Sequence, residues 1–498
     1  MKSAARQPAR SGHTLGLLSI LVGIVLAVVV GLVWGKPLWM ASGGPTRHIE
    51  ELEKTARQKQ RFAQQAAAAG NRTEAIRLNA QIPVIRQEIE RMRGLQRQAE
   101  QTDLTVERNI FTIVRFCGDI FLRMLFAIVV PLVVTSMISG VTSIGDMRRT
   151  GKVGAWTLIY YLTTGAMAVV LGITLVEIIQ PGVDTDDTFA YVNESLLARQ
   201  EPSVIGTVLE VVSGRVGDAG SGMIPANILE AASQTNVLAL ILFSLVFGGA
   251  LTTLGEKGRA AVEFFHAANE AVLKVVRLIL FFAPLGIFGL IATKIIQSGG
   301  GHAFADELHR LGWFVATVLL GLMIHAIVLC LVLWVFGRRN PFRYLYAMGR
   351  ALLTAMSTSS SSATLPVTIE CVEEAGVSKR SAGFVLPLGA TLNMDGTALY
   401  EATAAIFIAQ SAGVPLAGAA LVVVFLTATL AAIGAPGIPE AGLVTLLIVL
   451  AAVGLPATGI GTILAIDWFL DRQRTTLNVF GDAVGAAVID RYLDKPRA

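Results

Sequence analysis

Residues 467–482 read DWFLDRQRTTLNVFGD, and this stretch decides the fold. A helix turns through about 100° per residue, which places the polar side chains on one stripe about 100° wide. These side chains are Asp467, Asp471, Arg474, Thr475, Asn478 and Asp482. The alternative is the solvated face of a surface helix. Polar residues aligned on an otherwise apolar helix instead favour a stripe that faces a cavity inside a membrane protein.

The composition of the whole chain agrees with a membrane protein. Of its 498 residues, 53% are hydrophobic and 15% are charged, whereas soluble domains carry about 25% charged residues. A helix needs about 20 apolar residues to cross a bilayer. Charge-free runs of that order include 14–35, 124–145, 154–176, 231–255, 311–337, 402–439 and 441–466. We predict an all-α polytopic membrane protein with eight transmembrane helices and two segments that fold back, and we exclude a soluble, disordered or fibrous chain.

The distribution of charge predicts the orientation and the partners. Clusters of Lys and Arg flank the expected spans on one side, which by the positive-inside rule is the cytoplasm. We therefore expect a multi-pass protein of the plasma membrane, specifically a bacterial inner membrane, with both termini in the cytoplasm. The formal net charge of +4 is small for this length and gives no indication of nucleic-acid binding. The lipid bilayer is the expected environment.

Residues 46–108 differ from the rest in composition. The stretch 47–108 holds 21 charged residues, and its apolar residues follow a 4-3-4-3 spacing that is typical of a coiled-coil seam. The seam residues are Leu78, Ile82, Ile85, Ile89 and Met92. We predict a helical hairpin here, outside the membrane on the non-cytoplasmic side.

Three further polar segments lie in apolar surroundings. The serine run 357–362 suits the tip of a re-entrant hairpin, with a surface linker as the alternative. The segment 393–397 (NMDGT) contains poor helix formers, so we expect an unwound stretch whose oxygens could bind a cation such as sodium. The Gly- and Pro-rich segment 433–442 suits a second hairpin tip that acts as a lid, with a plain turn as the alternative. Glu401 lies in the same apolar run as 393–397, where burial favours the neutral carboxyl and makes it a candidate proton carrier.

The order of these segments is a pattern in itself. A hairpin precedes a broken polar helix, and a second hairpin precedes a second polar helix. Interrupted segments at corresponding places in two halves are typical of the binding site of a secondary transporter built from inverted repeats.

Four motifs resemble one family of transporters. They are Tyr160–Thr164 (YYLTT), Ser359–Pro366 (SSSSATLP), Asn393–Tyr400 (NMDGTALY) and Asp467–Asp482. They resemble the dicarboxylate/amino acid:cation symporters, which include the excitatory glutamate transporters, and the likeness runs from about residue 110 to 490. The resemblance implies uptake of glutamate or aspartate driven by sodium, a homotrimer, and a transport domain that moves like an elevator against a fixed scaffold.

The resemblance also implies roles for individual residues. Arg474 matches the residue that binds the side-chain carboxylate of the substrate, and Asp471 and Thr475 match those that bind its amino group. The other implied substrate contacts are Ser361, Ser362, Thr397, Ile438, Gly442 and Asn478. Three sodium sites are implied: Gly389, Asn393, Asn478 and Asp482; Thr391, Ala432, Ile433 and Ala435; and Tyr161, Thr164, Asn393 and Asp395. Glu401 implies proton co-transport with potassium counter-transport, and no organic cofactor is expected.

The resemblance implies a division of the chain into five parts. The chain also departs from the family at several positions. The expected parts are an N-terminus with the first transmembrane helix (1–45), the extramembrane hairpin (46–108), the remaining scaffold and transport helices (109–340), the transport core (341–491) and a cytoplasmic tail (492–498). Gly165 stands where the family offers a hydroxyl at the third sodium site. Pro436 and Glu440 are unusual in the lid, and the hairpin at 46–108 is not a general family feature.

Other functions have less support in the sequence. The same fold could carry neutral amino acids or C4-dicarboxylates, although a neutral substrate has no need of Arg474 and a dicarboxylate none of Asp471. An intramembrane serine hydrolase would need a base, and only His325 of the six histidines lies well inside a span. A channel would show current without saturable uptake. We therefore predict a transporter and no enzyme.

Overall fold

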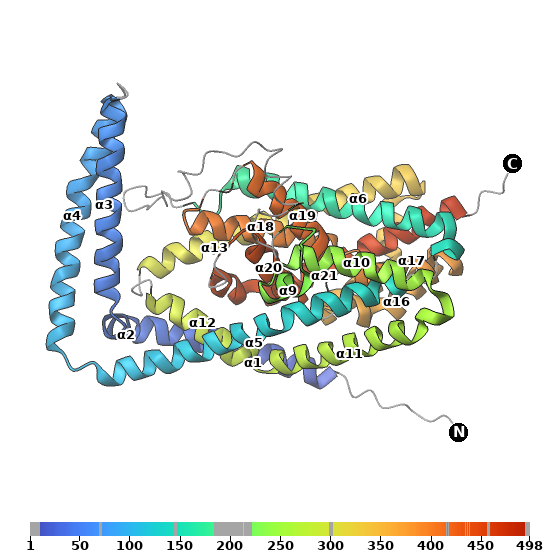
Figure 1. The fold of residues 1–498 in the computed structure, drawn as a ribbon, viewed down its shortest axis with the longest axis horizontal. Helices are drawn as coiled ribbons and strands as arrows, with labels where there is room; N and C mark the ends of the chain where they lie inside the picture. Colours follow the sequence, from blue (N-terminus) through green and yellow to red (C-terminus); the bar gives the residue numbers. More distant parts are fainter. Residues whose placement is uncertain are drawn as a thin grey trace.

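The computed structural model describes an entirely helical arrangement (Figure 1). The described residues are 10–68, 72–143, 147–183, 213, 222–297, 302–414, 416, 418–433, 435, 437, 439–455 and 459–493. Every secondary-structure element within these ranges is a helix. The first residues of the expected N-terminal part and residues 494–498 of the expected tail lie outside them, as do Gly434, Pro436 and Ile438 of the expected lid.

The first half of the chain forms long helices joined by short connections. They are α1 (Arg10–Val33), α2 (Gly35–Ala41), α3 (Gly44–Ala68), α4 (Arg72–Gln101), α5 (Thr105–Ser143), α6 (Met147–Ile179), α9 (Ile228–Ser233), α10 (Val237–Thr253), the 3₁₀ turn η1 (Gly255–Gly258), α11 (Arg259–Phe281) and α12 (Ala283–Gln297).

The second half consists mostly of shorter helices between two long ones. They are α13 (His302–Val332), the π-helical turn η2 (Leu333–Gly337), α14 (Pro341–Ala347), α15 (Gly349–Thr358), α16 (Ser361–Glu374), α17 (Lys379–Leu392), α18 (Asp395–Ser411), α19 (Ala419–Ile433), α20 (Ala441–Ala452) and α21 (Ile460–Leu493).

The polar segments fall where helices end. Helix α15 ends at Thr358, and the next residue, Ser359, has a φ of 50° in the left-handed region. Ser360 then caps α16 by accepting a hydrogen bond from the backbone N–H of Ala363 at 3.1 Å. Helix α17 ends at Leu392 and α18 begins at Asp395, so the chain is unwound at residues 393 and 394. Helices α19 and α20 pack against each other as a second hairpin.

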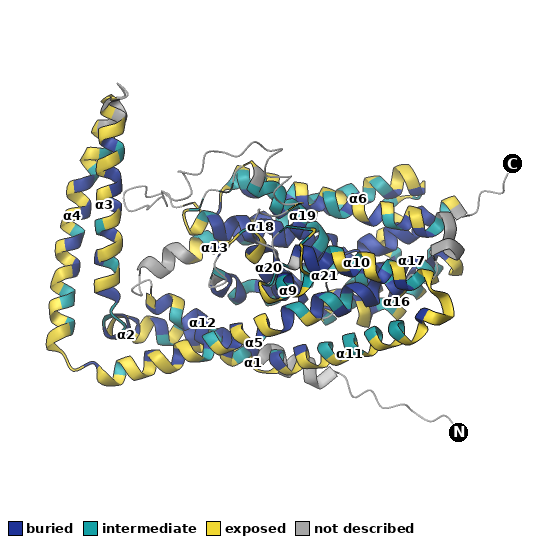
Figure 2. Cartoon of the chain, in the orientation of Figure 1, coloured by how far each residue is buried: buried dark blue, intermediate teal, exposed yellow. Residues whose placement is uncertain are grey.

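The helices form two packed groups. In the first, α5 contacts α10, α11 and α12, and α1 lies along α12; in the second, α21 contacts α13, α15, α16, α17 and α18, and α6 lies along α18. The two groups meet where α12 contacts α21. Glycines permit close approaches within each group. A Cβ at Gly289 of α12 would lie 2.5 Å from the backbone nitrogen of Gly118 of α5, and one at Gly172 of α6 would lie 2.7 Å from the carbonyl oxygen of Leu399 of α18. Figure 2 shows α18 buried along its length.

One arginine fastens the first hairpin, which α15 and α16 form, to α21. Arg339, which follows η2, donates hydrogen bonds to the carbonyl oxygens of Ala375 and Gly376 at 2.7 and 2.8 Å. Its Nη2 also lies 3.2 Å from Oδ2 of Asp490. The other carboxylate oxygen of Asp490 accepts from the backbone N–H of Ser378 at 3.1 Å. The end of α16 and the start of α17 are therefore tied to the last turns of α21.

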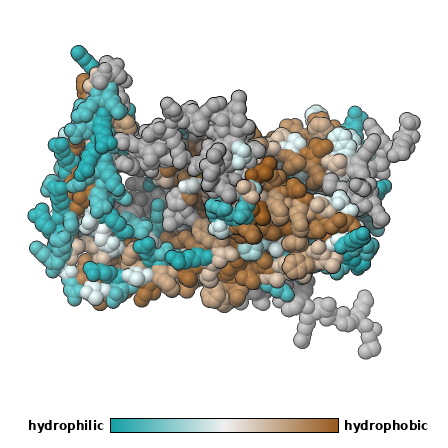
Figure 3. Space-filling view, in the orientation of Figure 1, coloured by the Kyte–Doolittle hydropathy of each residue, from teal (hydrophilic) through white to brown (hydrophobic). Residues whose placement is uncertain are grey.

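By length and composition, up to five spans occur among the described residues. Three single helices qualify: Thr105–Ser143, Val153–Ile179 and Leu308–Gly337. Two bent pairs add one span each if both arms cross together: Val22–Val33 with Gly35–Ala41, bent by 74°, and Gly255–Phe281 with Ala283–Gln297, bent by 54°. Figure 3 shows apolar surface over the body of the molecule and polar surface over α3 and α4. The prediction of a helical membrane protein is confirmed in this coarse form, whereas the number of eight spans stays a prediction.

The charged segment forms a two-helix hairpin. Helices α3 and α4 pack along each other, and Figure 1 shows them at a steep angle to α5 and α11. Ile82, Ile85, Ile89 and Met92 are buried. Lys59 Nζ donates to Gln81 Oε1 at 2.8 Å further out along the hairpin. Its base is fixed to the bundle by one apolar cluster, which contains Ile49, Leu52, Ile85, Ile89 and Met92 with Leu38, Trp39, Phe111 and Ile296.

Removing the outer part of the hairpin should leave transport intact. Deleting residues 60–80 and joining Lys59 to Gln81 through a short Gly/Ser bridge removes the outer parts of α3 and α4. The apolar cluster at the base of the hairpin is kept. We expect uptake into proteoliposomes and the Tm in detergent to change little. As a contrast, Ile85→Asp buries an unpaired charge in the cluster and should lower the Tm clearly. Loss of uptake in a correctly folded deletion variant would show that the hairpin takes part in transport.

Candidate functional site

The polar stripe lies on one continuous helix. Helix α21 runs unbroken from Ile460 to Leu493, and all six stripe residues are buried, namely Asp467, Asp471, Arg474, Thr475, Asn478 and Asp482. Buried polar groups are generally hydrogen-bonded, and here many of the partners come from the interrupted helices around α21.

Arg474 is the centre of the stripe, with 1% of its surface exposed. Its Nη2 donates to Oδ1 of Asp471 at 2.9 Å and lies 3.1 Å from Oδ1 of Asp467. Its guanidinium carbon lies 3.8 Å from the centroid of the Tyr400 ring, which is a cation–π geometry. Its Nε and Nη1 have no hydrogen-bond partner within the described residues. Two charged N–H donor groups are therefore available to an anion such as a carboxylate.

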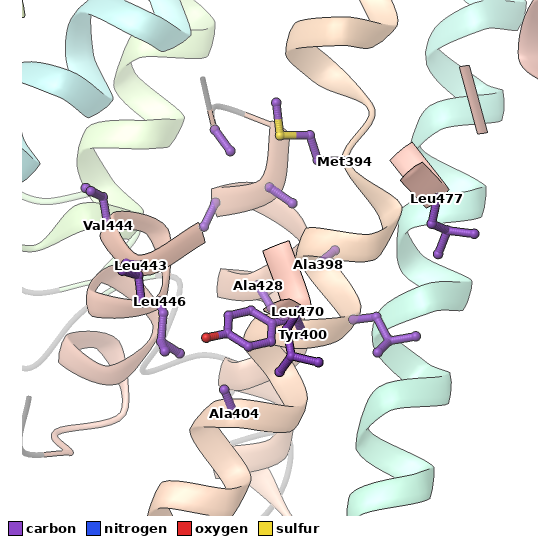
Figure 4. Packing of buried hydrophobic residues seen from close by; sticks show 14 of the residues in the cluster. Met394, Ala398, Tyr400, Ala404, Ala428, Leu443, Val444, Leu446, Leu470 and Leu477 are labelled. Carbon is purple, nitrogen blue, oxygen red and sulfur yellow. The ribbon is translucent and has the colours of Figure 1, made fainter. Parts of the chain in front are cut away.

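The start of α20 lies directly over this guanidinium. A Cβ at Gly442 would lie 2.6 Å from Nη1 of Arg474, so only glycine fits beside the side chain as it is placed. The backbone N–H of Glu440 donates to Oδ2 of Asp471 at 3.0 Å, and Glu440 has a φ of 61° in the left-handed region. Figure 4 shows the Tyr400 ring extending from α18 toward the α20 residues Leu443 and Leu446.

The tips of the two hairpins meet. The carbonyl oxygen of Gly437 accepts from the Ser360 hydroxyl at 2.5 Å and from the backbone N–H of Ser362 at 3.3 Å. A Cβ at Gly437 would lie 2.5 Å from Oγ of Ser362 and 2.8 Å from the carbonyl oxygen of Ala390. Ser361 is buried beneath this contact, whereas Ser362 is exposed. The described parts of both hairpins thus close against each other and against the end of α17.

Asn478 joins α21 to the break between α17 and α18. Its side-chain oxygen accepts from the backbone N–H of Gly396 at 2.8 Å, and its amide nitrogen donates to the Thr397 hydroxyl at 3.2 Å. A Cβ at Gly396 would lie 2.8 Å from the carbonyl oxygen of Arg474. The start of α18 is therefore held close to the centre of the polar stripe.

Oxygen atoms gather on the other side of the break. Asn393 Nδ2 donates to Oδ1 of Asp482 at 3.0 Å, and a Cβ at Gly389 would collide with that carboxylate. The hydroxyl of Thr164 lies 3.2 Å from Oδ1 of Asp395 and 3.4 Å from Oδ1 of Asn393.

A small cavity opens at these oxygens, between α6, the break and α19. The residues that line it are Tyr161, Leu162, Gly165, Leu392, Asn393, Met394, Asp395, Ala398, Thr429, Ala432 and Ile433. It brings together residues of the second and third predicted sodium sites. Thr391 and Ala435 do not line it, and the Thr391 hydroxyl donates to the carbonyl oxygen of Leu388 at 3.0 Å. Ile438 lies outside the described residues.

Glu401 lies two turns into α18. It is completely buried, and its carboxylate oxygens have no hydrogen-bond partner within the described residues. A charged carboxylate without partners is costly in such a place. The neutral, protonated form is therefore the one that fits these surroundings.

The sequence interpretation assigned no role to several residues that form the site. Ser360 joins the hairpin tips, Tyr400 stacks on Arg474, Asp467 pairs with Arg474, and His325 Nε2 lies 3.0 Å from Oδ2 of Asp395. The sequence did carry weak signals for three of these residues. Tyr400 ends the NMDGTALY motif, Asp467 begins the polar stripe, and His325 interrupts an apolar run.

Comparison with known proteins identifies the family. The family model of the sodium:dicarboxylate symporter family matches residues 17–492. This chain belongs to that family, which confirms the resemblance of its motifs. Membership of a symporter family makes the chain a membrane transporter and not an enzyme, and it implies coupling to sodium.

Individual relatives are similar over most of their length. The chain is 42% identical over 424 residues to excitatory amino acid transporter 3 of Mus musculus, covering 76% of this chain and 79% of the relative. It is 40% identical over 413 residues to an excitatory amino acid transporter of Caenorhabditis elegans, covering 76% and 81%. It is 39% identical over 428 residues to excitatory amino acid transporter 2 of Homo sapiens, covering 77% and 74%.

Gly442→Ala should weaken binding at Arg474, because the added methyl group would overlap Nη1. Overpacking of this kind costs about 1–3 kcal/mol, which corresponds to a rise of roughly 5- to 150-fold in the KM for an acidic substrate. Gly383→Ala is the matched control, since a Cβ there meets nothing within 4 Å. An unchanged KM in Gly442→Ala would contradict the close approach of α20 to the guanidinium.

Proposed function

We propose that this chain is a secondary active symporter that takes up acidic amino acids, glutamate or aspartate, driven by the sodium gradient. One observation carries the proposal: a buried arginine, Arg474, keeps two nitrogen donors that have no hydrogen-bond partner within the described residues, in the middle of a polar stripe. A guanidinium binds a carboxylate through strong, charge-assisted hydrogen bonds. The side-chain carboxylate of the substrate is the group that we assign to these donors.

The remaining substrate contacts follow from what surrounds Arg474. Asp471 supplies a carboxylate for the ammonium group of an amino acid, together with the Thr475 hydroxyl. Ser361 and Ser362 lie in the first turn of α16, where backbone N–H groups favour an anion, and we assign them to the α-carboxylate. We assign Thr397, Asn478 and Gly442 as further contacts, and Ile438 is expected to complete the set.

We propose that co-transported sodium ions drive the uptake. The first proposed site uses Gly389, Asn393, Asn478 and Asp482; the second uses Thr391, Ala432, Ile433 and Ala435; the third uses Tyr161, Thr164, Asn393 and Asp395. Oxygen ligands suit a hard cation. The cavity at Asp395 and the contact between Asn393 and Asp482 support the third and the first site.

The proposed architecture has eight transmembrane helices and two re-entrant hairpins in inverted repeats. We propose that the helices around α21 move as an elevator against the scaffold of α1, α5, α10, α11 and α12, within a homotrimer. The packing of the helices into these two groups supports such a division. The protein is proposed to lie in the plasma membrane with both termini in the cytoplasm, and the hairpin of α3 and α4 outside it.

The alternative is the same fold with a neutral amino acid or a C4-dicarboxylate as the substrate. A dicarboxylate would satisfy Arg474 and leave Asp471 facing no ammonium group, whereas a neutral substrate would leave the guanidinium facing no carboxylate. Competition of radiolabelled aspartate uptake by unlabelled glutamate, succinate and alanine separates the three possibilities.

Arg474→Cys should abolish uptake of aspartate and glutamate. A site built to bond a charged group loses its preferred substrate when the partner is removed, and the smaller side chain leaves room for neutral amino acids. The measurement is sodium-driven uptake into proteoliposomes. Arg472→Cys is the control, because Arg472 stacks over Trp468 and bonds its carbonyl oxygen. Unchanged aspartate uptake in Arg474→Cys would refute the assignment.

We further propose that Glu401 couples uptake to proton co-transport and potassium counter-transport. The carboxyl crosses the membrane protonated with the substrate, because moving a bare charge is penalised, and it returns after losing the proton. Glu401→Gln should therefore make net uptake insensitive to external pH and to internal potassium while substrate exchange survives. Wild-type uptake that ignores both the proton and the potassium gradient would refute the coupling.

A further inference from the structure

His325 is buried behind Asp395, one of the residues that line the small cavity. It lies in the C-terminal half of α13, surrounded in sequence by Leu, Met, Ile, Ala and Val. Its Nε2 lies 3.0 Å from Oδ2 of Asp395, and the two side chains are each 1% exposed. Because Asp395 begins α18, this contact ties α13 to the break between α17 and α18.

Packing among the apolar residues of α13 does not explain the histidine. Its second ring nitrogen, Nδ1, has no hydrogen-bond partner within the described residues. A buried polar atom without a partner is destabilising, and unsatisfied groups of this kind in native structures call for an explanation. An aliphatic residue would avoid that cost, but it would leave Oδ2 of the buried Asp395 without the partner that it has here. The requirement for histidine therefore lies at the atom that is bonded, Nε2.

The two oxygens of Asp395 have different surroundings. Oδ2 is held by His325, and Oδ1 faces the hydroxyl of Thr164 at 3.2 Å. A Cβ at Gly165 would lie 3.7 Å from Oδ1, in ordinary contact, so the backbone of α6 leaves open space beside that oxygen. Both Gly165 and Asp395 line the cavity.

We propose that His325 is a positioning residue for Asp395, which fixes the carboxylate so that Oδ1 is presented to a sodium ion in the cavity. In this role the imidazole donates its Nε2 hydrogen to Oδ2 and does not contact the ion. This role rests on the proposed function, because it assumes sodium as the cargo. Groups that orient a metal ligand through its second atom commonly set the affinity of the site without touching the metal.

The amides of glutamine and asparagine provide a matched pair of variants. In His325→Gln the amide nitrogen can occupy the place of Nε2 and donate to Asp395. In His325→Asn it occupies the place of Nδ1, which is too close to the backbone to reach the carboxylate. His325→Leu removes the donor altogether. His266→Gln is the control for a half-buried, hydrogen-bonded histidine elsewhere, since Nδ1 of His266 bonds the Ser139 hydroxyl between α11 and α5 at 2.6 Å.

The experiment measures sodium binding directly on the purified full chain. A ligand that binds only the folded state stabilises it by RT ln(1 + [L]/Kd), so the Tm begins to rise near the dissociation constant and goes on rising with the logarithm of the concentration. The Tm in detergent is therefore recorded against sodium chloride at constant ionic strength with choline chloride and without substrate. We expect the apparent sodium affinity to fall roughly 10- to 100-fold in His325→Leu and His325→Asn. In His325→Gln and His266→Gln it should stay within about threefold of wild type. At saturating sodium the KM for aspartate should change little in every variant.

The outcomes separate this role from the proposed function. A wild-type chain that sodium does not stabilise would overturn sodium coupling, and the role of His325 with it. A wild type stabilised by sodium, with His325→Asn responding identically, would overturn the positioning role alone. Equal losses in His325→Gln and His325→Asn would also overturn it, because they would show that the volume of the side chain matters and the position of its donor does not.

Discussion

A guanidinium buried in an apolar helix bundle is the constraint on which the rest of this structure depends. An isolated charge in such a place is very costly. Arg474 therefore requires the carboxylates of Asp467 and Asp471 on α21 and the ring face of Tyr400 on α18. Two carboxylates against one guanidinium leave excess negative charge, which suits a ligand that carries an ammonium group. Glycine at position 442 then allows a second hairpin to approach this cluster.

The interruptions in the helices serve the same cluster. An unbroken helix uses its backbone groups internally, and irregular backbone at membrane depth is tolerated where it is buried in protein or lines a cavity. At the break before α18 the N–H of Gly396 is free to bond Asn478, and in the second hairpin the N–H of Glu440 is free to bond Asp471. Main-chain groups thus complete a site that side chains of α21 begin.

The spacing of polar residues along 467–482 was enough to predict α21 and its stripe, because helical periodicity relates residues a few positions apart. Local sequence pattern also located the hairpin tips and the break, where Ser, Gly, Asn and Asp interrupt apolar runs. It did not show that Ser360 would bond Gly437, or that His325 would bond Asp395, since these pairs lie 77 and 70 residues apart. Such contacts depend on how helices pack, which periodicity does not encode. The number of spans depends likewise on bends such as the 74° angle between α1 and α2.

The hydrogen bonds and the ion pair of Arg339 distinguish the first hairpin (α15 and α16) from the second (α19 and α20). Opening the first hairpin at its base would separate Arg339 from two carbonyl oxygens and leave Asp490 unpaired. The described part of the second hairpin reaches α21 through one backbone N–H, that of Glu440, and otherwise mainly through apolar contacts. In α20 the residues from Ala441 to Leu450 are all buried, whereas α16 buries five residues, Ser361, Thr364, Thr368, Cys371 and Val372. Separating the second hairpin from the protein therefore exposes apolar surface, at a cost that grows with its area, whereas separating the first breaks directed hydrogen bonds and an ion pair at its base.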